Sequence, residues 1–411
     1  MSVTPQGSRA TAQVPTDLLI GGQWVPASDA GRFPVIDPAS GETIAEVANA
    51  TVADARLALD AAEAAATTWR DYPPRERAEL LRAAFELMRQ REEDLTELIV
   101  RENGKAWDDA LGEVRYAAEF FRWYAEEAVR MLGETSRAPA GTNMILTLRQ
   151  PIGMSLLITP WNFPAAMATR KLGPALAAGC TVLLKPASDT PLTALAIGDI
   201  LTEVGVPAGV VNILPSRRSD ELSTALLGDP RVRKLSFTGS TAVGRDLLRK
   251  AAENVVSCSM ELGGNAPVIV CADADLDVAV DGTMVAKMRN GGEACTAANR
   301  IYVHADVAEE FTRRLSEAMA AIPVGTGMDR SNRMGPLINP AARRKVTDLV
   351  GDAVRRGATL VTDARPDAAS GSFYPPTVLT GVDPDADIMH TEVFGPVAPI
   401  ATFTSDDEAI A

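Results

Sequence analysis

"TVLLKPASDTPLTALAIGDILTEVGVPAGVVNILP", residues 181–215, is the stretch that decides the fold class. "TVLLKP" is a short apolar run that predicts a buried strand, and "PLTALAIGDILTEVG" has the apolar spacing of a helix that ends at Gly205. "GVVNILP" predicts the next strand, and a helix near 219–227, a strand in "VRKLSFTGS" and a helix in "TAVGRDLLRKAAE" follow. This alternation predicts an α/β fold with a parallel sheet and helices on both of its faces.

The regions on either side extend this pattern. Helical spacing predicts helices over 52–70, 75–101 and 107–131, and "NMILTLRQPIGMSLLITP" (143–160) predicts a hairpin interrupted at "PIG". A second α/β run starts at "NAPVIVCADADLD" and continues with a helix over 275–290, the strand "NRIYVH" and a helix over 306–320. The glycine pair Gly263-Gly264 precedes this run, so we expect a domain boundary there. The last residues, "FTSDDEAIA", predict a helix start too short to be stable alone, which suggests a truncated C-terminus.

The composition restricts the classes of function. Among 411 residues, 54 acidic side chains outnumber 40 basic ones, for a net charge of −14, which argues against nucleic acid or an anionic membrane as partner. The N-terminus is polar and unlike a secretory signal, and no apolar run approaches the roughly 20 residues of a membrane span. The four cysteines are widely spaced without a CxxC pair, so neither a zinc site nor a disulfide framework is indicated. These features predict a cytoplasmic enzyme without a metal site.

Cys295 is the candidate nucleophile, because "RNGGEACTAANR" (289–300) surrounds it with small and polar residues, whereas the other three cysteines lie in apolar segments. A reactive thiolate needs such access; the alternative is a buried cysteine that only packs. The chain has only two histidines, His304 and His390, and we expect both to be structural. Glu261 in "MELGGNAP" (260–267) is then the candidate general base, unless an unseen cation pairs with it.

Three further motifs follow predicted strands, where ligands of open α/β sheets bind. "SFTGSTAVG" (236–244) places Gly239 before a helix whose N-terminus suits a phosphate, although it lacks GxGxxG spacing and a plain junction would look similar. Lys185 in "LLKPAS" would hold a ribose hydroxyl or a phosphate, or else reach solvent. Asn162 in "TPWNFP" would donate to an oxyanion, or else form a turn. "TEVFGPV" (391–397) adds Glu392 and Phe394 in a loop.

In this order, "TPWNFP", "LKPAS", "FTGS", "MELGGNAP", the Cys295 loop and "EVFGP" closely resemble the aldehyde dehydrogenase superfamily, from about Ile20 to the last residue. "KMRNGGEACTAANR" and "WNFPAAMATRK" are most like its succinate-semialdehyde dehydrogenase branch. The resemblance implies a Rossmann-like, parallel-sheet NAD(P)-binding domain formed by 1–135 and 151–263, an oligomerisation hairpin over 136–150, and an α/β catalytic domain over 264–411 that is incomplete at its C-terminus. It also implies a homodimer or homotetramer.

The resemblance implies roles for individual residues. Cys295 attacks the aldehyde to give a thiohemiacetal and then a thioester, Asn162 with the N–H of Cys295 stabilises the oxyanion, and Glu261 activates the hydrolytic water. The cofactor contacts fall on Thr159, Trp161, Lys185, Ser188, Gly239, Ser240, Glu392 and Phe394.

Three positions bear on specificity, one for the cofactor and two for the substrate. Where the family carries a glutamate that repels a 2′-phosphate, this chain has Ser188, so we expect NADP⁺ to be preferred over NAD⁺. Arg170 and Arg289 match arginines that grip a distal carboxylate, which suggests succinic semialdehyde as the substrate. Ala297 takes the place of a second cysteine used elsewhere in the branch for redox control. The alternatives are another aliphatic aldehyde or semialdehyde, a truncated member that only binds cofactor, and a hydrolase that acts through Cys295.

Overall fold

A computed structural model of the chain describes residues 14–362 and 371–410. They fall into two compact units, which are described separately. The first comprises Met1–Val35, Thr43–Ile99 and Leu111–Glu261, and the second comprises Ile36–Glu42, Val100–Ala110 and Leu262–Ala411. A two-stranded sheet pairs β3 (Arg32–Ile36) with β4 (Thr43–Ala48).

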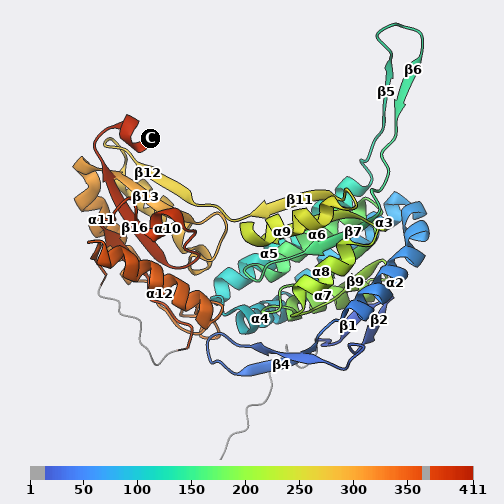
Figure 1. Ribbon diagram of the computed structural model, residues 1–411, viewed down its shortest axis with the longest axis horizontal. Helices are drawn as coiled ribbons and strands as arrows, with labels where there is room; N and C mark the ends of the chain where they lie inside the picture. Colours follow the sequence, from blue (N-terminus) through green and yellow to red (C-terminus); the bar gives the residue numbers. More distant parts are fainter. Residues whose placement is uncertain (1–13, 363–370, 411) are drawn as a thin grey trace, which may run out of the picture. The chain divides into compact units, whose positions relative to one another are not determined.

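The first unit is built on a seven-stranded sheet in the order β11-β10-β7-β8-β9-β1-β2 (Figure 1). The four strands β10, β7, β8 and β9 are parallel to one another, and β1 joins β9 in antiparallel pairing. Every residue of β7, β8 and β9 is buried, as expected for parallel strands covered on both faces. The predicted parallel sheet is therefore confirmed. The strands are β1 (Leu18–Ile20), β2 (Gln23–Val25), β7 (Met154–Ile158), β8 (Val182–Lys185), β9 (Val211–Ile213), β10 (Val232–Gly239) and β11 (Ser257–Leu262).

Helices connect the parallel strands, as the sequence predicts. They are α6 (Pro164–Ala177), α7 (Leu192–Glu203), α8 (Ser219–Leu227) and α9 (Thr241–Ala252). Earlier in the chain lie α2 (Val52–Asp71), α3 (Pro74–Gln90), α4 (Glu92–Asn103) and α5 (Trp107–Ala128). The single helix expected over 75–101 is wrong, because α3 ends before Arg91, which departs from helical geometry at φ −100° and ψ 19°. Three acidic residues in the first turn of α4 favour a new helix N-terminus there.

The hairpin expected over 143–160 is also wrong in its pairing. β6 (Met144–Thr147) pairs antiparallel with β5 (Glu134–Arg137), whereas β7 lies inside the large sheet between β10 and β8. Burial explains the difference, since β7 is a continuous apolar run that is buried throughout, while all residues of β5 and β6 are exposed. The two short strands extend from the rest of the first unit as an arm (Figure 1).

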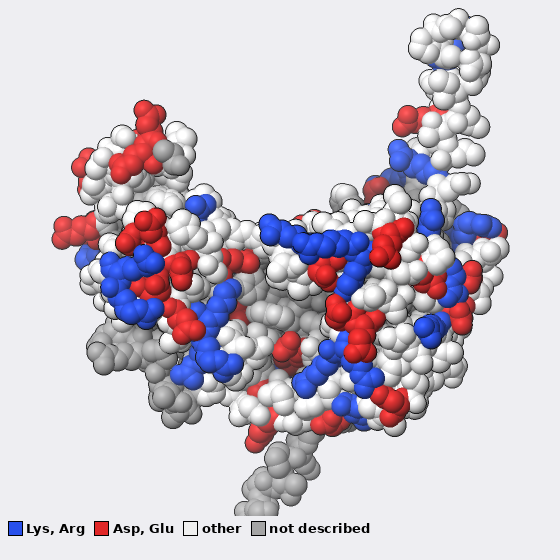
Figure 2. All heavy atoms as spheres, in the orientation of Figure 1, with Lys and Arg blue, Asp and Glu red and all other residues white. Residues whose placement is uncertain are grey.

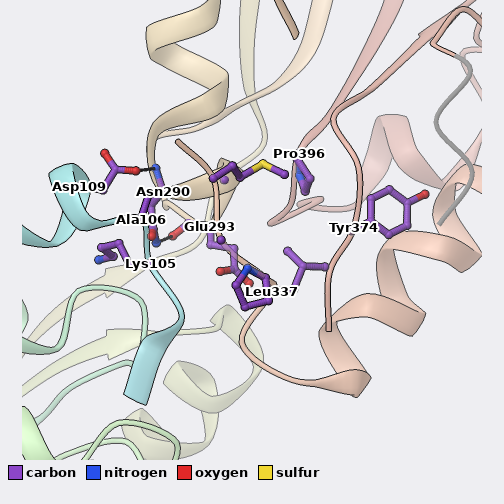
Figure 3. Close-up of a pocket in the computed structure, with 12 residues that line it drawn as sticks. Lys105, Ala106, Asp109, Asn290, Glu293, Leu337, Tyr374 and Pro396 are labelled. Carbon is purple, nitrogen blue, oxygen red and sulfur yellow. Dashed lines mark hydrogen bonds between the residues drawn. The ribbon is translucent and has the colours of Figure 1, made fainter. Parts of the chain in front are cut away.

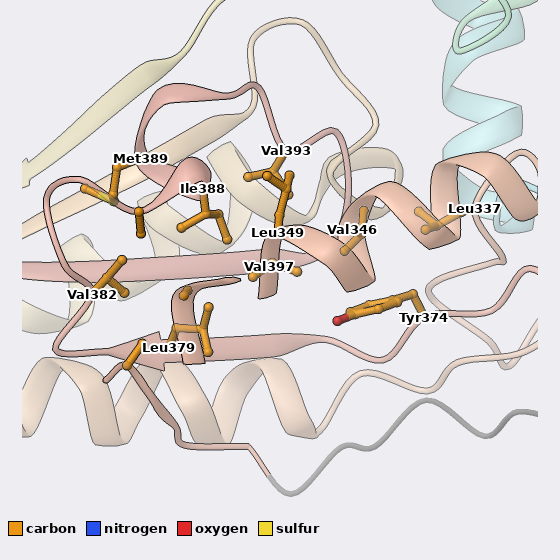
Figure 4. Close-up of a cluster of buried hydrophobic side chains, with 13 residues drawn as sticks. Leu337, Val346, Leu349, Tyr374, Leu379, Val382, Ile388, Met389, Val393 and Val397 are labelled. Atoms are coloured by element: carbon orange, nitrogen blue, oxygen red, sulfur yellow. The ribbon is translucent and has the colours of Figure 1, made fainter. Parts of the chain in front are cut away.

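The second unit is built on a five-stranded sheet in the order β12-β13-β16-β15-β14, parallel except for β14. One apolar core packs Leu379 and Val397 of the sheet against Val346 and Leu349 of a helix (Figure 4). The strands are β12 (Ala266–Val270), β13 (Ala298–His304), β14 (Thr359–Leu360), β15 (Thr377–Thr380) and β16 (Val397–Phe403). The helices are α10 (Leu276–Met288), the 3₁₀ helix η1 (Arg289–Gly292), α11 (Ala305–Ala320), α12 (Pro340–Arg355), α13 (Asp387–His390) and α14 (Asp406–Ile410).

Basic and acidic side chains are intermixed on the visible face of each unit. On the face drawn in Figure 2, lysine and arginine side chains alternate with aspartate and glutamate over both units. Arg231 illustrates the pairing, because its guanidinium contacts the carboxylates of Asp60, Glu63 and Asp229 at 2.8–2.9 Å. Such exposed pairs each contribute only about 0–1 kcal/mol to stability.

Candidate functional site

Three predicted cofactor residues lie at one edge of the large sheet. β7, β8 and β10 are parallel, so their carboxyl ends meet at the same edge. Ile158 is in register with Lys185 on one side and with Phe237 on the other, which places Thr159, Lys185 and Gly239 at neighbouring strand ends. The Thr159 N–H donates to the Lys185 carbonyl at 3.2 Å. This edge is where open α/β sheets bind their ligands.

Lys185 is buried at this edge, which excludes the alternative of a lysine that reaches solvent. Its ammonium donates to the Pro186 carbonyl at 3.1 Å. Burial lowers the pKa of Lys185 to about 8, and the nearby charge of Asp189 acts in the opposite direction. Ser188 is half-buried three residues further on. A buried cation beside a small hydroxyl suits an anionic or hydroxyl-rich ligand.

Gly239 and Ser240 begin α9 directly after β10. Ser240 is the N-cap, and its hydroxyl accepts a hydrogen bond from the Val243 N–H at 3.4 Å. A Cβ on Gly239 would come within 2.5 Å of the Phe237 ring, so any larger residue here would require that ring to shift. The N–H groups of the first helical turn and the positive end of the helix dipole then suit a phosphate.

Asn162 lies in the loop between β7 and α6, and its side chain is buried. The same loop is held at Trp161, whose carbonyl accepts from the Thr190 hydroxyl at 3.3 Å. Sequence reasoning missed Glu113, whose buried Oε1 accepts from the N–H groups of Ala165 and Ala166 at 2.9 and 3.2 Å. A carboxylate at a helix N-terminus is stabilised by the helix dipole. Glu113 therefore fixes the start of α6 and, with it, the Asn162 loop.

Two neighbouring cations on α6 face different partners. Arg170 donates to the Tyr116 hydroxyl at 2.7 Å, and its guanidinium lies 5.3 Å from the centre of the Phe120 ring. Lys171, which sequence reasoning missed, donates to the Ser236 hydroxyl at 2.9 Å. Burial lowers the pKa of Lys171 to about 8, and the charge of Glu261 opposes that shift. Glu261 thus lies within electrostatic range of a buried lysine.

Glu261 itself differs from expectation in one respect. It is near the end of β11 and exposed, so the costly burial of a lone carboxylate assumed from the sequence is not found. The reason is geometric: β11 is an edge strand, and every second residue along it, Glu261 included, is exposed.

In the second unit, Cys295 follows η1 and is exposed, as predicted. The expectation that it differs from all other cysteines is wrong, because Cys271, directly after β12, is exposed as well. Asn290, Gly291 and Gly292 before it have positive φ values of 52°, 59° and 80°. Left-handed backbone is unfavourable for a residue with a Cβ, so the asparagine conformation must be held by its surroundings.

The Cys295 loop lies against the segment that carries Glu392 and Phe394. A Cβ on Gly292 would overlap the carbonyl oxygen of Gly395, so the two backbones are in close contact. Phe394 is itself held in the left-handed region at φ 55°. The second unit therefore brings together three of the predicted residues, Cys295, Glu392 and Phe394, by direct packing of their loops.

Glu392 is half-buried and surrounded by basic groups. Lys345 donates to its backbone carbonyl at 2.7 Å, and the charges of Lys345 and Lys287 both favour its ionised form. Burial is the larger effect and raises the pKa of Glu392. A Cβ on Gly263 would overlap Oε2 of Glu392, so a larger residue at 263 would require the Glu392 carboxylate to move. Lys287, missed from the sequence, is fully buried, and burial lowers its pKa to about 7.

The predicted residues are thus divided between the units. The first carries Asn162, Glu261 and Arg170 with most of the cofactor residues, and the second carries Cys295 with the exposed Arg289. Over residues 14–362 and 371–410, no cluster of three or more histidine, cysteine, aspartate or glutamate side chains could hold a metal. In the same described residues, no helix has the length and apolar character needed to cross a bilayer.

The chain is similar to known proteins over most of its length. Residues 24–411 match the aldehyde dehydrogenase family. The chain is 53% identical to a succinate-semialdehyde dehydrogenase of Paenarthrobacter nicotinovorans, over 89% of this chain and 82% of the relative. It is 43% identical to the NADP(+) succinate-semialdehyde dehydrogenase of Escherichia coli, over 96% and 81%. A crystal structure of succinate-semialdehyde dehydrogenase from Burkholderia pseudomallei superposes with a TM-score of 0.96 at 42% identity, over 99% and 84% of the two chains. The chain therefore belongs to the aldehyde dehydrogenase family.

Proposed function

We propose that this protein oxidises succinic semialdehyde to succinate with a nicotinamide dinucleotide as hydride acceptor. The observation that carries the proposal is the exposed Cys295 thiol on an anchored left-handed loop, packed against the segment of Glu392 and Phe394, in a chain of this family. The succinate-semialdehyde dehydrogenases among its relatives support the choice of substrate. In this proposal the first unit holds the cofactor and the second supplies the nucleophile.

The chemistry requires a nucleophile because an aldehyde carbon does not readily release hydride until another group has added to it. The Cys295 thiolate adds to the carbonyl carbon, and the amide of Asn162 and the N–H of Cys295 stabilise the oxyanion. After hydride departure, Glu261 accepts a proton from a water molecule whose oxygen attacks the thioester. The thiolate then leaves, and the product is a carboxylic acid.

The residues at the sheet edge fit a dinucleotide. Lys185 and Ser188 suit the adenosine ribose, and the N-terminus of α9 at Ser240 suits the pyrophosphate. In the second unit, Glu392 is the residue proposed for the nicotinamide ribose. When bound, the cofactor supplies the hydride acceptor. We also propose that NADP⁺ is preferred, because Ser188 adds no negative charge beside the buried ammonium of Lys185.

Replacing Ser188 tests this preference. We expect Ser188→Glu to lower kcat/KM for NADP⁺ by about 10–100-fold, because its carboxylate repels a 2′-phosphate, and to change the value for NAD⁺ by less than about threefold. Steady-state kinetics with both cofactors measures the effect. Ser188→Ala is the matched control and should lower kcat/KM for NADP⁺ by less than about fivefold. A parallel loss for both cofactors in Ser188→Glu would contradict the assignment.

The proposed activity has a direct test. The purified chain is given succinic semialdehyde with NADP⁺ and, separately, with NAD⁺, and reduced cofactor is followed by its near-ultraviolet absorbance. Turnover supports the proposal, and faster turnover with NADP⁺ supports the preference. Cofactor binding in a thermal-shift measurement without turnover identifies a member that only binds cofactor, and acid release without cofactor reduction identifies a hydrolase.

We propose that the chain forms a homodimer or homotetramer through the β5–β6 arm. Four exposed apolar side chains, Leu132, Met144, Leu146 and Leu148, lie on or beside this arm and are each 65–72% exposed. Exposed apolar clusters of this kind mark protein–protein contacts. We place this assembly in the cytoplasm, and the four free thiols of the chain support a reducing compartment.

Charge on the arm should dissociate the assembly. We expect the double variant Met144→Asp, Leu146→Asp to shift the mass measured by light scattering to that of a single chain, since burying two unpaired carboxylates is unfavourable. Val278→Asp, at an exposed apolar position of α10, is the matched control and should keep the wild-type mass. An unchanged mass for the arm variant would place the interface elsewhere.

A further inference from the structure

A cluster of buried charged residues lies beneath the Cys295 loop, and the proposed chemistry does not use it. Lys105 and Glu293 are each 3% exposed, and both line a small cavity of the second unit together with Asp109 (Figure 3). The ionisable side chains of Lys105 and Glu293 are costly to bury, so their retention requires an explanation.

Hydrogen bonds connect this cluster to the left-handed turn before the nucleophile. Oδ2 of Asp109 accepts from the Asn290 N–H at 3.3 Å, which holds the backbone of the residue with φ 52°. The Asn290 side-chain amide donates to the Glu293 carbonyl at 3.1 Å, and the Glu293 N–H donates back to the Asn290 carbonyl at 3.0 Å. The turn is therefore closed on itself between Asn290 and Glu293, and it is attached to α5 at Asn290, five residues before Cys295.

The Glu293 side chain extends this attachment to a distant segment. Its Oε1 accepts from the Ile338 N–H at 3.1 Å, across 45 residues of sequence. On the other side, Gly292 is pressed against the Gly395 carbonyl, so the turn is also confined from the segment that carries Phe394. The loop is thus held by three parts of the second unit, and Glu293 provides the attachment to the 336–338 segment.

We propose that Glu293 is a positioning residue, which together with Asp109 and Lys105 holds the Cys295 loop in its reactive conformation. The inference rests on the proposed function only for its kinetic consequences. A nucleophile displaced by about 1 Å can lose about a hundredfold in rate, which is why such support matters.

Burial favours the protonated form of the Glu293 carboxyl, whereas the Ile338 N–H and the charge of Lys105 favour the ionised form. Lys105 in the loop before α5 is the cation that faces it, and Asp109 on α5 and Tyr374 before β15 line the same cavity, with Arg289 of η1 close to Asp109. Burial outweighs Lys105 and raises the pKa of Glu293 from 4.5 to about 8. The folded protein therefore binds this proton more tightly than the unfolded chain does. The free energy of unfolding consequently falls as pH rises from the unfolded pKa to about 8.

Two substitutions separate the roles of shape and charge. Glu293→Gln keeps the acceptor oxygen and remains neutral at every pH, whereas Glu293→Ala removes the acceptor. We expect Glu293→Ala to lower kcat by about 10–100-fold with KM changed less than about threefold, and Glu293→Gln to recover most of the loss near neutral pH. Above about pH 8 the ratio of wild-type to Glu293→Gln kcat should fall, because only wild type acquires the buried charge. Glu309→Gln, at an exposed position of α11, is the matched control.

Two measurements do not depend on turnover. The alkylation rate of Cys295 by iodoacetamide, read by peptide mass spectrometry, should change in Glu293→Ala and return toward wild type in Glu293→Gln. The melting temperature of wild type relative to Glu293→Gln should fall between about pH 5 and pH 8. Equal behaviour of the two variants, or a pH-independent difference in melting temperature, would overturn the proposal. If Glu293→Ala does not fold, the comparison of wild type with Glu293→Gln still decides, and an absence of turnover in wild type would refute only the proposed activity.

Discussion

Cys295→Ser is expected to lower kcat for aldehyde oxidation by at least about a thousandfold. A serine hydroxyl stays protonated at neutral pH, so its addition to the aldehyde carbon becomes rate-limiting. Steady-state absorbance of reduced cofactor measures the loss. Thermal shift with added cofactor verifies that the variant is folded and binds the dinucleotide.

Cys271→Ser is the matched control, because Cys271 is the other exposed cysteine of the second unit. It should leave kcat within about twofold of wild type, since it lies directly after β12 and away from the left-handed loop. If the two variants lost activity equally, or if Cys295→Ser retained more than about a tenth of the wild-type kcat, the assignment of the nucleophile would be wrong.

Arg289→Gln is expected to raise KM for succinic semialdehyde by about 30–100-fold and KM for an uncharged aliphatic aldehyde by less than about threefold. A charge-assisted, bidentate hydrogen bond to the distal carboxylate contributes about 1.5–3 kcal/mol, and only the semialdehyde has that carboxylate. The measurement is a comparison of the two substrates at saturating cofactor. Arg313→Gln, on the exposed surface of α11, is the control for loss of one positive charge.

Equal increases in KM for both aldehydes would show that Arg289 supports the fold or the loop and does not recognise the substrate. Glutaric semialdehyde, one methylene longer, extends the experiment. If wild type used it as efficiently as succinic semialdehyde, the arginines would select for a carboxylate and not for its distance from the aldehyde.

Features that depend on local pattern were predictable from the sequence. The runs "MSLLI" and "TVLLKP" are continuously apolar, and both form buried parallel strands whose ends carry Thr159 and Lys185. A short, continuously apolar run can be recognised as a buried strand from the local sequence alone, because both of its faces must be covered whatever its neighbours in the sheet are. The polar, glycine-bearing setting of Cys295 was equally local, and so its exposure was correctly expected.

Features that depend on distant partners were not predictable. β6 pairs with β5 and not with β7, because β7 enters the core of the large sheet. The periodicity of the sequence does not indicate which of two neighbouring strands will be buried in this way. The buried acids Glu113 and Glu293 are compensated by N–H groups 52 and 45 residues away, at Ala165 and Ile338. One signal was available for Glu113, since it lies on a helix between the apolar residues Ala110, Val114 and Ala117, all buried. A lone charge on an apolar helical face indicates a buried partner even when the partner is unknown.

The glycine at 263 has a consequence for anyone who redesigns this enzyme. Gly263 lies two residues after Glu261 in the chain. Oε2 of Glu392 occupies the space that a Cβ at position 263 would fill. Directed-evolution libraries aimed at cofactor usage should therefore hold position 263 constant and concentrate diversity at Ser188, where a half-buried side chain leaves freedom. By the same steric argument, a different side chain at position 392 would change the space available to the residue at 263, which follows the general base Glu261 in the chain. Substitutions at 263 and 392 are therefore expected to be non-additive in their effects.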